Sequence, residues 1–157
     1  MSSLEGPASA IWHLGDVAAF VGDEEAVTLA DPDGVATRVP LHGGAILCSA
    51  SDGRRVVTGG DDGRIVSIAA DGAPEMLLTD SKRRWIDTIA LQGDGALAWS
   101  AGKTVFARTA KGEVKSLDLP SSIGGLAFAP KGFRLAVAHY NGVTLWFPNM
   151  AGAPQFL

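Results

Sequence analysis

The chain has 157 residues, 46% hydrophobic and 19% charged, which is enough apolar material for about one folded domain and too little charge for disorder. Its formal net charge of −4 argues against nucleic acid as the main ligand, because nucleic-acid-binding surfaces are basic. Its one cysteine, Cys48, excludes an intrachain disulfide, and no signal-peptide pattern or apolar run of ~20 residues occurs, so we expect a cytoplasmic location and no membrane contact.

Glycine-containing turns recur along the chain at a nearly constant interval. In one series the glycines follow one another after 38, 40 and 40 residues, and they are Gly34, Gly72, Gly112 and Gly152. In a second series the intervals are 39 and 40, and the glycines are Gly63, Gly102 and Gly142. An interval near 40 that contains only strand-like runs is typical of a propeller blade repeat. We therefore expect an all-β fold.

Each repeat contains four short apolar runs separated by turns, and these runs predict four antiparallel strands. In chain order the first repeat has predicted strands at 10–14, 17–21, 26–29 and 36–39. The second repeat has them at 46–50, 56–59, 65–68 and 75–78. The third has them at 86–91, 96–100, 104–108 and 114–117, and the fourth at 123–129, 134–139, 143–147 and 155–157. The corresponding blades are 10–41, 45–79, 86–119 and 123–157 of a single partial propeller domain, 1–157.

The clearest repeat unit lies near the end of the chain, where two apolar runs flank Asn141-Gly142. Asn-Gly between two strand-like runs is the strongest local signal for a tight hairpin, because both residues tolerate the positive φ of a type I′ turn. We therefore predict a type I′ turn centred on Asn141 and Gly142.

Several motifs connect these repeats with a known family. Pro130-Lys131-Gly132 precedes a second strand, and Asn141-Gly142 leads into Val143-Thr144-Leu145-Trp146. Ala50-Ser51-Asp52-Gly53 followed by Gly59-Gly60-Asp61-Asp62-Gly63 is a second match. With these motifs the chain resembles the WD40 repeat proteins, which are β-propellers with four-stranded blades.

The chain departs from that family in its signature residues. No repeat has the Trp-Asp dipeptide, and the family's Gly-His pair has only an inverted counterpart, His42-Gly43. The buried His–Asp–Ser–Trp hydrogen-bond set of the family therefore cannot be complete in any repeat. We expect the blades to rest more on apolar packing than on that network.

Four blades are about half of the seven or eight that the resemblance implies. The fold class expected is thus a WD40-like β-propeller of four four-stranded antiparallel blades, as a half propeller or incomplete ring. Unpaired terminal blades would expose apolar faces, which is rare on a monomer. We expect these blades to bind either the missing remainder of the propeller or a second copy of the chain, as a homo-oligomer.

The candidate binding residues lie in loops on one rim of such a propeller. The cluster Lys82, Arg83, Arg84 and Trp85 combines the side chains that most often anchor protein interfaces. The alternative is that Trp85 packs at a blade junction and the three cations are solvated. His139 and Tyr140 end a strand on the same rim and complete the predicted binding set.

No metal or cofactor is predicted. The three histidines, His13, His42 and His139, are too far apart in sequence for a zinc motif. Asp61-Asp62-Gly63 is better explained as a tight turn than as a calcium loop, because the other oxygen ligands are missing.

The resemblance implies a protein–protein interaction scaffold that binds partners through rim loops, and no catalysis is assigned. The alternative is a propeller enzyme or small-ligand binder that uses the central channel. That alternative needs convergent carboxylates, histidines or a metal at the ends of the inner strands. These strands carry mainly Ile, Leu, Ala and Ser, with Asp87 and His13 as exceptions. A third interpretation is a structural piece whose only partner is its missing other half.

Overall fold

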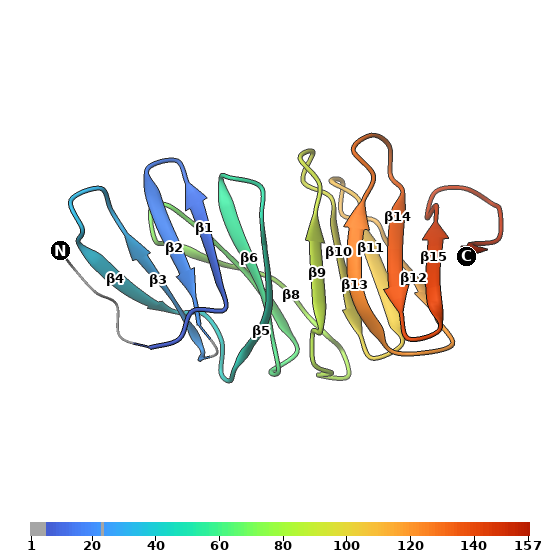
Figure 1. The fold of residues 1–157 in the computed structure, drawn as a ribbon, viewed down its shortest axis with the longest axis horizontal. Coiled ribbons are helices and arrows are strands. Elements are labelled where there is room, and N and C mark those ends of the chain that lie inside the picture. The colour runs from blue at the N-terminus through green and yellow to red at the C-terminus, as the bar shows by residue number, and fades with distance from the viewer. Residues whose placement is uncertain (1–5, 23) are drawn as a thin grey trace. The chain divides into compact units, whose positions relative to one another are not determined.

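The structure is a computed structural model that describes residues 6–22 and 24–157. In these residues the chain forms sixteen strands and no helix (Figure 1). The described residues thus include no helix of the length and apolar character that crossing a membrane requires.

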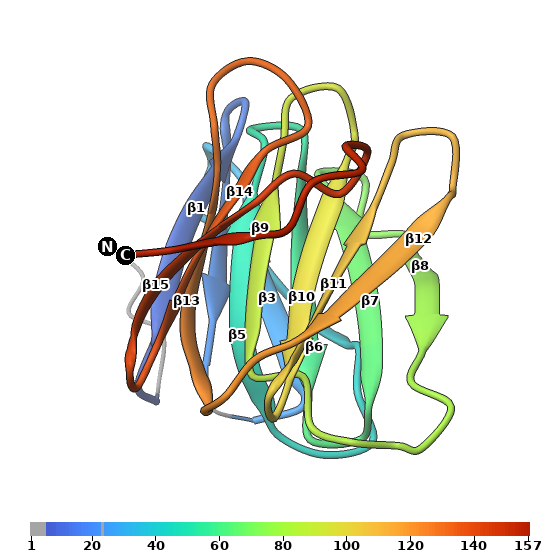
Figure 2. The same ribbon diagram turned by 90° about the vertical axis from the view of Figure 1, so that its right-hand side faces the viewer.

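The strands form four separate four-stranded antiparallel sheets. The first sheet contains β1 (Ala10–Leu14), β2 (Val17–Val21), β3 (Ala26–Ala30) and β4 (Ala36–Pro40). The second contains β5 (Ile46–Ser51), β6 (Arg55–Gly60), β7 (Arg64–Ala69) and β8 (Pro74–Thr79); β7 is labelled in Figure 2. The third contains β9 (Thr88–Leu91), β10 (Leu97–Ala101), β11 (Thr104–Arg108) and β12 (Val114–Asp118). The fourth contains β13 (Ile123–Phe128), β14 (Leu135–His139), β15 (Gly142–Trp146) and β16 (Gln155–Phe156).

In every sheet, strands that are consecutive in sequence are also neighbours. This order needs only short connections, and the glycine turns supply them. The three glycines Gly63, Gly102 and Gly142 all have positive φ, at 75°, 63° and 142°. The prediction of four four-stranded antiparallel sheets is therefore confirmed.

The chain divides into two compact units, the first ending at Trp85 and the second spanning Ile86–Leu157. The core of the first unit includes Val21 and Val27 from sheet one and Val56 and Ile68 from sheet two. Val27 and Val56 are fully buried, and burying a side chain of this size stabilises a fold by about 1.5–3 kcal/mol.

The second unit has its own core between its two sheets. Ala98 and Val105 of the third sheet lie in one cluster with Leu135, Val137 and Trp146 of the fourth. Each unit therefore consists of two sheets that bury one face against each other.

The hairpin turn between β14 and β15 differs from the prediction. His139 pairs with Gly142, so the two loop residues are Tyr140 and Asn141. Neither of them has positive φ, and the predicted type I′ turn centred on Asn141-Gly142 is wrong. The Tyr140 N–H donates to the Ser122 carbonyl at 3.1 Å and the Asn141 N–H to Ser121 Oγ at 3.2 Å. These two bonds hold the loop one residue earlier than the Asn-Gly signal suggests.

The predicted inner strand at 86–91 is shorter in the structure, since β9 begins at Thr88. Asp87 lies just before this strand, and its carboxylate accepts a hydrogen bond from the N–H of Gly102, in the β10–β11 turn, at 2.8 Å.

Candidate functional site

In the first unit, the rim loops are the β6–β7 turn and the connections that follow β4 and β8. Two backbone hydrogen bonds of these loops meet at Gly63. The Asp80 N–H donates to the Gly63 carbonyl at 2.7 Å, and the Gly63 N–H donates to the Gly60 carbonyl at 3.3 Å. The turn and the residues after β8 are thereby fastened together.

A buried polar network lies beneath this turn. His42 Nδ1 is 3.0 Å from Asp62 Oδ1, and His42 Nε2 is 2.8 Å from Thr58 Oγ1. A carboxylate only accepts, so His42 Nδ1 carries the proton in the bond to Asp62. The imidazole of His42 has no exposed side-chain surface, and Thr58 is fully buried.

This network bears on an expectation from the sequence, in which His42-Gly43 is only an inverted counterpart of the family's pair and the blades rest more on apolar packing than on a buried hydrogen-bond set. The structure gives this sheet a His–Asp–Thr network, although no tryptophan completes it. Asp62 also makes the local bond expected of a turn residue, accepting the Arg64 N–H at 3.0 Å.

The environment of Asp62 favours its ionised form. Burial raises the pKa of this carboxyl, but hydrogen bonds from the Gly43 N–H, the His42 ring and the Arg64 N–H outweigh it and lower the pKa. The ionised Asp62 therefore helps to hold the rim together.

The residues after β8 form a compact loop around the carboxylate of Asp80. Asp80 Oδ2 accepts the N–H groups of Lys82 and Arg84, each at 3.0 Å. Arg84 also reaches back with its side chain, with Nη2 at 2.7 Å from Asp80 Oδ1 and Nε at 3.2 Å from Oδ2. We call residues 80–85 the Asp80 loop.

The hydrogen bond from the Arg84 side chain is the largest reason that the pKa of Asp80 lies below its ordinary value. Burial opposes it, and the N–H groups of Arg84 and Lys82 add to the lowering of the pKa. Because the acceptor is ionised, these bonds belong to the strong, charge-assisted class.

The four predicted binding residues of this loop have different positions. Arg84 is two-thirds buried and bound to Asp80, so it builds the loop. Lys82 and Arg83 are exposed, and neither takes part in an ion pair among the residues that the structure describes. Trp85 is 63% exposed.

The other two predicted binding residues lie in the second unit. His139 is held between two hydroxyl groups, with Nδ1 3.1 Å from Ser121 Oγ and Nε2 3.0 Å from Thr144 Oγ1. Tyr140 follows it at the tip of the β14–β15 loop and is 91% exposed. His139 thus supports the loop from the inside through its two hydrogen bonds, and the side chain of Tyr140 is exposed at the tip.

Ser121 and His139 form the hydroxyl–imidazole pair that nucleophilic catalysis uses, but the geometry serves a different purpose. In a catalytic triad a carboxylate orients the second ring nitrogen. Here that nitrogen faces the hydroxyl of Thr144, and Ser121 Oγ already accepts the Asn141 N–H. Within the described part of the chain, no group of three or more His, Cys, Asp and Glu side chains could hold a metal ion.

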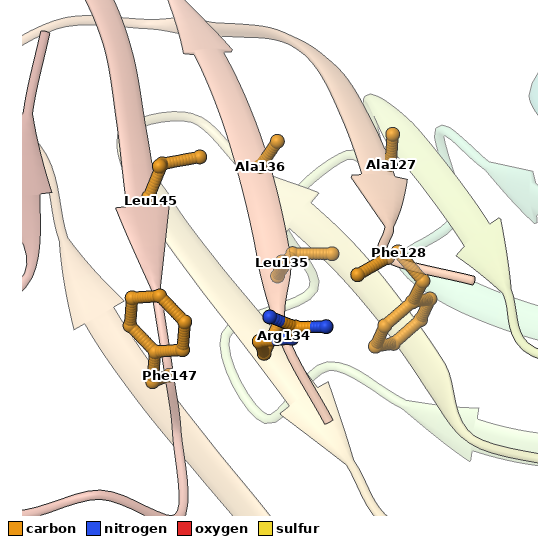
Figure 3. Close-up of a pocket in the computed structure, with 8 residues that line it drawn as sticks. Ala127, Phe128, Arg134, Leu135, Ala136, Leu145 and Phe147 are labelled. Carbon is orange, nitrogen blue, oxygen red and sulfur yellow. The ribbon is translucent and has the colours of Figure 1, made fainter. Parts of the chain in front are cut away.

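A shallow apolar hollow of about 270 Å³ lies on the open face of β13, β14 and β15. Figure 3 shows Ala127, Ala136 and Leu145 side by side across the three strands, with the Arg134 side chain between Phe128 and Phe147. The guanidinium of Arg134 donates twice to the Lys131 carbonyl, at 3.2 and 3.0 Å. No single residue type or motif signals this hollow, because it depends on the register of three strands.

No family model matches the chain, and no curated protein matches it in sequence. Two solved structures resemble its fold. One is a chain of the crystal structure of a mitotic checkpoint complex, with a TM-score of 0.78 and 18% identity; the match covers 99% of this chain and 52% of that one. The other is the computationally designed Ika4 protein, with a TM-score of 0.73 and 15% identity, covering 94% of each chain.

Both similar structures are propeller proteins, and the all-β propeller fold predicted from the sequence is thereby shown. The present chain spans about half the length of the checkpoint-complex chain that it matches. At 15–18% identity the likeness shows the fold alone, and membership of the WD40 repeat family is not shown.

Proposed function

We propose that the chain is a protein–protein interaction scaffold of the WD40 repeat type that binds a partner through its rim loops. The observation that carries this proposal is the Asp80 loop. Its backbone is fixed by Asp80 and Gly63, while Lys82, Arg83 and Trp85 are exposed. A rigid scaffold that presents loops is the usual arrangement for recognition, and Arg and Trp are enriched among interface anchors. Tyr140 is the matching candidate of the second unit.

A site-specific crosslinking experiment tests this proposal. A photoreactive residue is placed at Lys82 in one variant and at Lys111 in a control, both of which are exposed. Lys111 lies in the turn between β11 and β12, away from the Asp80 loop in sequence and in its own unit. We expect a discrete crosslinked protein from position 82 and none from position 111 when cells of the source organism are irradiated. Equal or absent crosslinking at both positions contradicts the proposal.

The open sheet faces support a second part of the proposal, self-association through the terminal sheets. Opposite residues of an antiparallel sheet lie on the same face. In the first unit, the face with Trp12, Ala19 and Leu29 is buried toward sheet two, and Trp12 Nε1 donates to Ser49 Oγ at 3.1 Å. We call this the forward face.

The surface that receives it is the face of sheet two that carries Ser49, Thr58 and Val66, which we call the rear face. The same arrangement recurs in the second unit. There the forward face of sheet three, with Ala98 and Ala107, meets the rear face of sheet four, with Leu135 and Trp146.

Each unit leaves two of its four sheet faces without such cover, and in each unit one of these belongs to the first or the last sheet of the chain. In the second unit it is the forward face of sheet four, formed by Ala127, Ala136 and Leu145, which contains the hollow. In the first unit it is the rear face of sheet one, formed by Ile11, Phe20 and Thr28. Ile11 is 58% exposed. Because forward faces bind rear faces within each unit, we propose that sheet four of one copy binds sheet one of a second copy.

A further inference from the structure

We infer that the Asp80 loop recognises an acidic segment of a protein partner, with Lys82 and Arg83 binding its carboxylates and Trp85 contacting an apolar residue beside them. This inference rests on the proposed scaffold function and names the chemistry of the partner. It is carried by the charge of the loop, by the exposure of Trp85 and by the backbone of Arg83.

Around the loop, the carboxylates of Asp80 and Asp62 have partners within the chain, whereas the cations of Lys82 and Arg83 have no ion pair among the described residues. Asp80 is bound to Arg84, and Asp62 is bound to His42 and to two N–H groups. These carboxylates are therefore already satisfied by the fold. Lys82 and Arg83 remain exposed without an ion pair among the described residues, although the whole chain has a net charge of −4. A local cationic site on an acidic protein favours an acidic partner over one with uniform negative charge such as a nucleic acid.

The backbone of Arg83 is the second observation. Its φ is +52°, and it is the one non-glycine residue with positive φ in the described part of the chain. Such a conformation costs a residue with a side chain free energy, whereas glycine adopts it readily. The Arg83 N–H donates to the Asp80 carbonyl at 2.9 Å, so the conformation belongs to the loop itself.

An arginine at this position therefore opposes the conformational preference of its own backbone. Among residues 6–22 and 24–157, no ion pair of Arg83 explains the choice of side chain. Positions where a strained backbone persists are often functional. The planar guanidinium of arginine, which binds carboxylates through two parallel hydrogen bonds, supplies the function that glycine could not.

Peptide binding tests the inference with defined probes. An array of short peptides that mix Glu and Asp with single Leu or Phe residues is compared with the same peptides carrying Gln and Asn. We expect the intact chain to bind the acidic series and to release it as salt is raised, because exposed charge pairs are screened. Equal binding of both series, or tighter binding of duplex DNA, overturns the inference.

Variants separate recognition from folding. Arg83→Gly removes the guanidinium and relieves the backbone, so we expect an unchanged or slightly higher Tm together with acidic-peptide binding about tenfold weaker. Trp85→Ala should weaken binding about thirtyfold, as is typical of an aromatic anchor. Lys111→Ala, at an exposed lysine elsewhere, serves as the control and should change neither quantity.

The possible failures are distinguishable from one another. If Arg83→Gly lowers the Tm and keeps the binding, the arginine is structural and the inference is wrong. If acidic peptides do not bind while the crosslink from position 82 still captures a protein, the acidic partner is wrong and the scaffold function stands. Loss of both results contradicts the proposed function as well.

Discussion

At the scale of single residues, Gly63 is the position on which the rim of the first unit depends most directly. Its φ is +75°, and a Cβ placed there would lie 2.8 Å from the Cα of Arg83. A methyl group therefore conflicts with the backbone conformation and also with the Asp80 loop. Glycine is needed here for two independent reasons.

We predict that Gly63→Ala lowers the free energy of unfolding by about 1–3 kcal/mol, measured by urea denaturation. Gly15→Ala is the matched control. Gly15 has φ of +63° in the same unit, but nothing lies within 4 Å of a Cβ added to it. The control should therefore lose stability only through its backbone. Equal losses in the two variants would show that the contact with Arg83 has no energetic effect.

The His42–Asp62–Thr58 network gives a second prediction at this scale. Thr58→Val keeps the shape of the side chain but leaves His42 Nε2 buried without its partner, and we expect a loss of about 1–3 kcal/mol. Thr37→Val, on the exposed strand β4, is the control and should change stability by less than about 0.5 kcal/mol. Similar values for both variants would mean that the network contributes no net stability.

Acid should weaken the first unit through Asp62. Its pKa is lowered in the folded state, so the ionised carboxylate stabilises the fold above the ordinary pKa of aspartate. This stability is lost as the pH falls through that value toward the lowered one. We expect Asp62→Asn to unfold with a smaller dependence on pH below about pH 5, monitored by circular dichroism during acid titration. Asp33→Asn, in an exposed turn, should behave like the parent chain.

At the scale of elements, the Asp80 loop shows how one carboxylate fixes a connection. Asp80 accepts two backbone N–H groups and two donors of the Arg84 side chain. Without these bonds, nothing in the residue types of Ser81-Lys82-Arg83 favours a single conformation. The loop therefore has a defined conformation before any partner binds, because Asp80, its first residue, hydrogen-bonds the residues that follow.

We predict that Asp80→Ala makes the loop a better substrate for trypsin, which cleaves after Lys82, Arg83 and Arg84. Losing a charge-assisted network should lower the local opening free energy by about 1.5–3 kcal/mol, and cleavage should become at least about tenfold faster. Mass spectrometry identifies the cut positions. Cleavage after Arg54, in the turn before β6, is the internal control and should keep its rate. An unchanged rate at 82–84 contradicts this role of Asp80.

The same elements show what could be predicted from the sequence. The interval of the glycine turns and the apolar runs predicted all four sheets, because turn chemistry and strand propensity are local properties. The predicted β14–β15 turn lies one residue later than the observed loop, which is held from outside the hairpin by Ser121 and Ser122.

The side-chain contacts of the candidate site could be predicted only in part, because some of them join residues far apart in the sequence. The hydrogen bond between His42 and Asp62 joins residues 20 positions apart in sequence. In addition, Gly43 follows His42, whereas the Gly-His pair of the WD40 repeat has the glycine first. Arg84 belongs to the binding cluster predicted from the sequence, whereas the structure pairs it with Asp80, which lies just before that cluster. The i,i+4 spacing of this pair was a readable signal, although such a bond is usually considered for helices.

At the scale of the whole molecule, the first and the last sheet each have one face without cover inside their own unit, and these two faces are of opposite type. The forward face of sheet four contains Ala127, Ala136 and Leu145, and its equivalent within the second unit is the triplet Ala90, Ala98 and Ala107. This face of sheet three is packed into the core of the second unit, to which Ala98 and Ala107 belong. A surface built on the pattern of an interior face is expected to bind a rear face.

We predict that the chain self-associates and that Leu145→Glu and Ile11→Glu each abolish association, measured by sedimentation velocity. Val114→Glu, at an exposed position of β12, is the control and should leave it intact. Mixing the two interface variants should restore one contact, because each retains the face that the other has lost. A monomeric parent chain contradicts the proposal, and association of Ile11→Glu alone would point to identical faces meeting.

Because every sheet has one forward and one rear face, the sheets of the chain share one direction of packing, and this direction matters for insertion of sheets as well as for contact between copies. A sheet inserted in frame at one of the periodic glycines would bring its own matching surface on either side. Lengthening such a gene by internal duplication would then require no newly evolved packing, only the repetition of an existing joint. Homologues that differ by whole blades would be the natural record of that process.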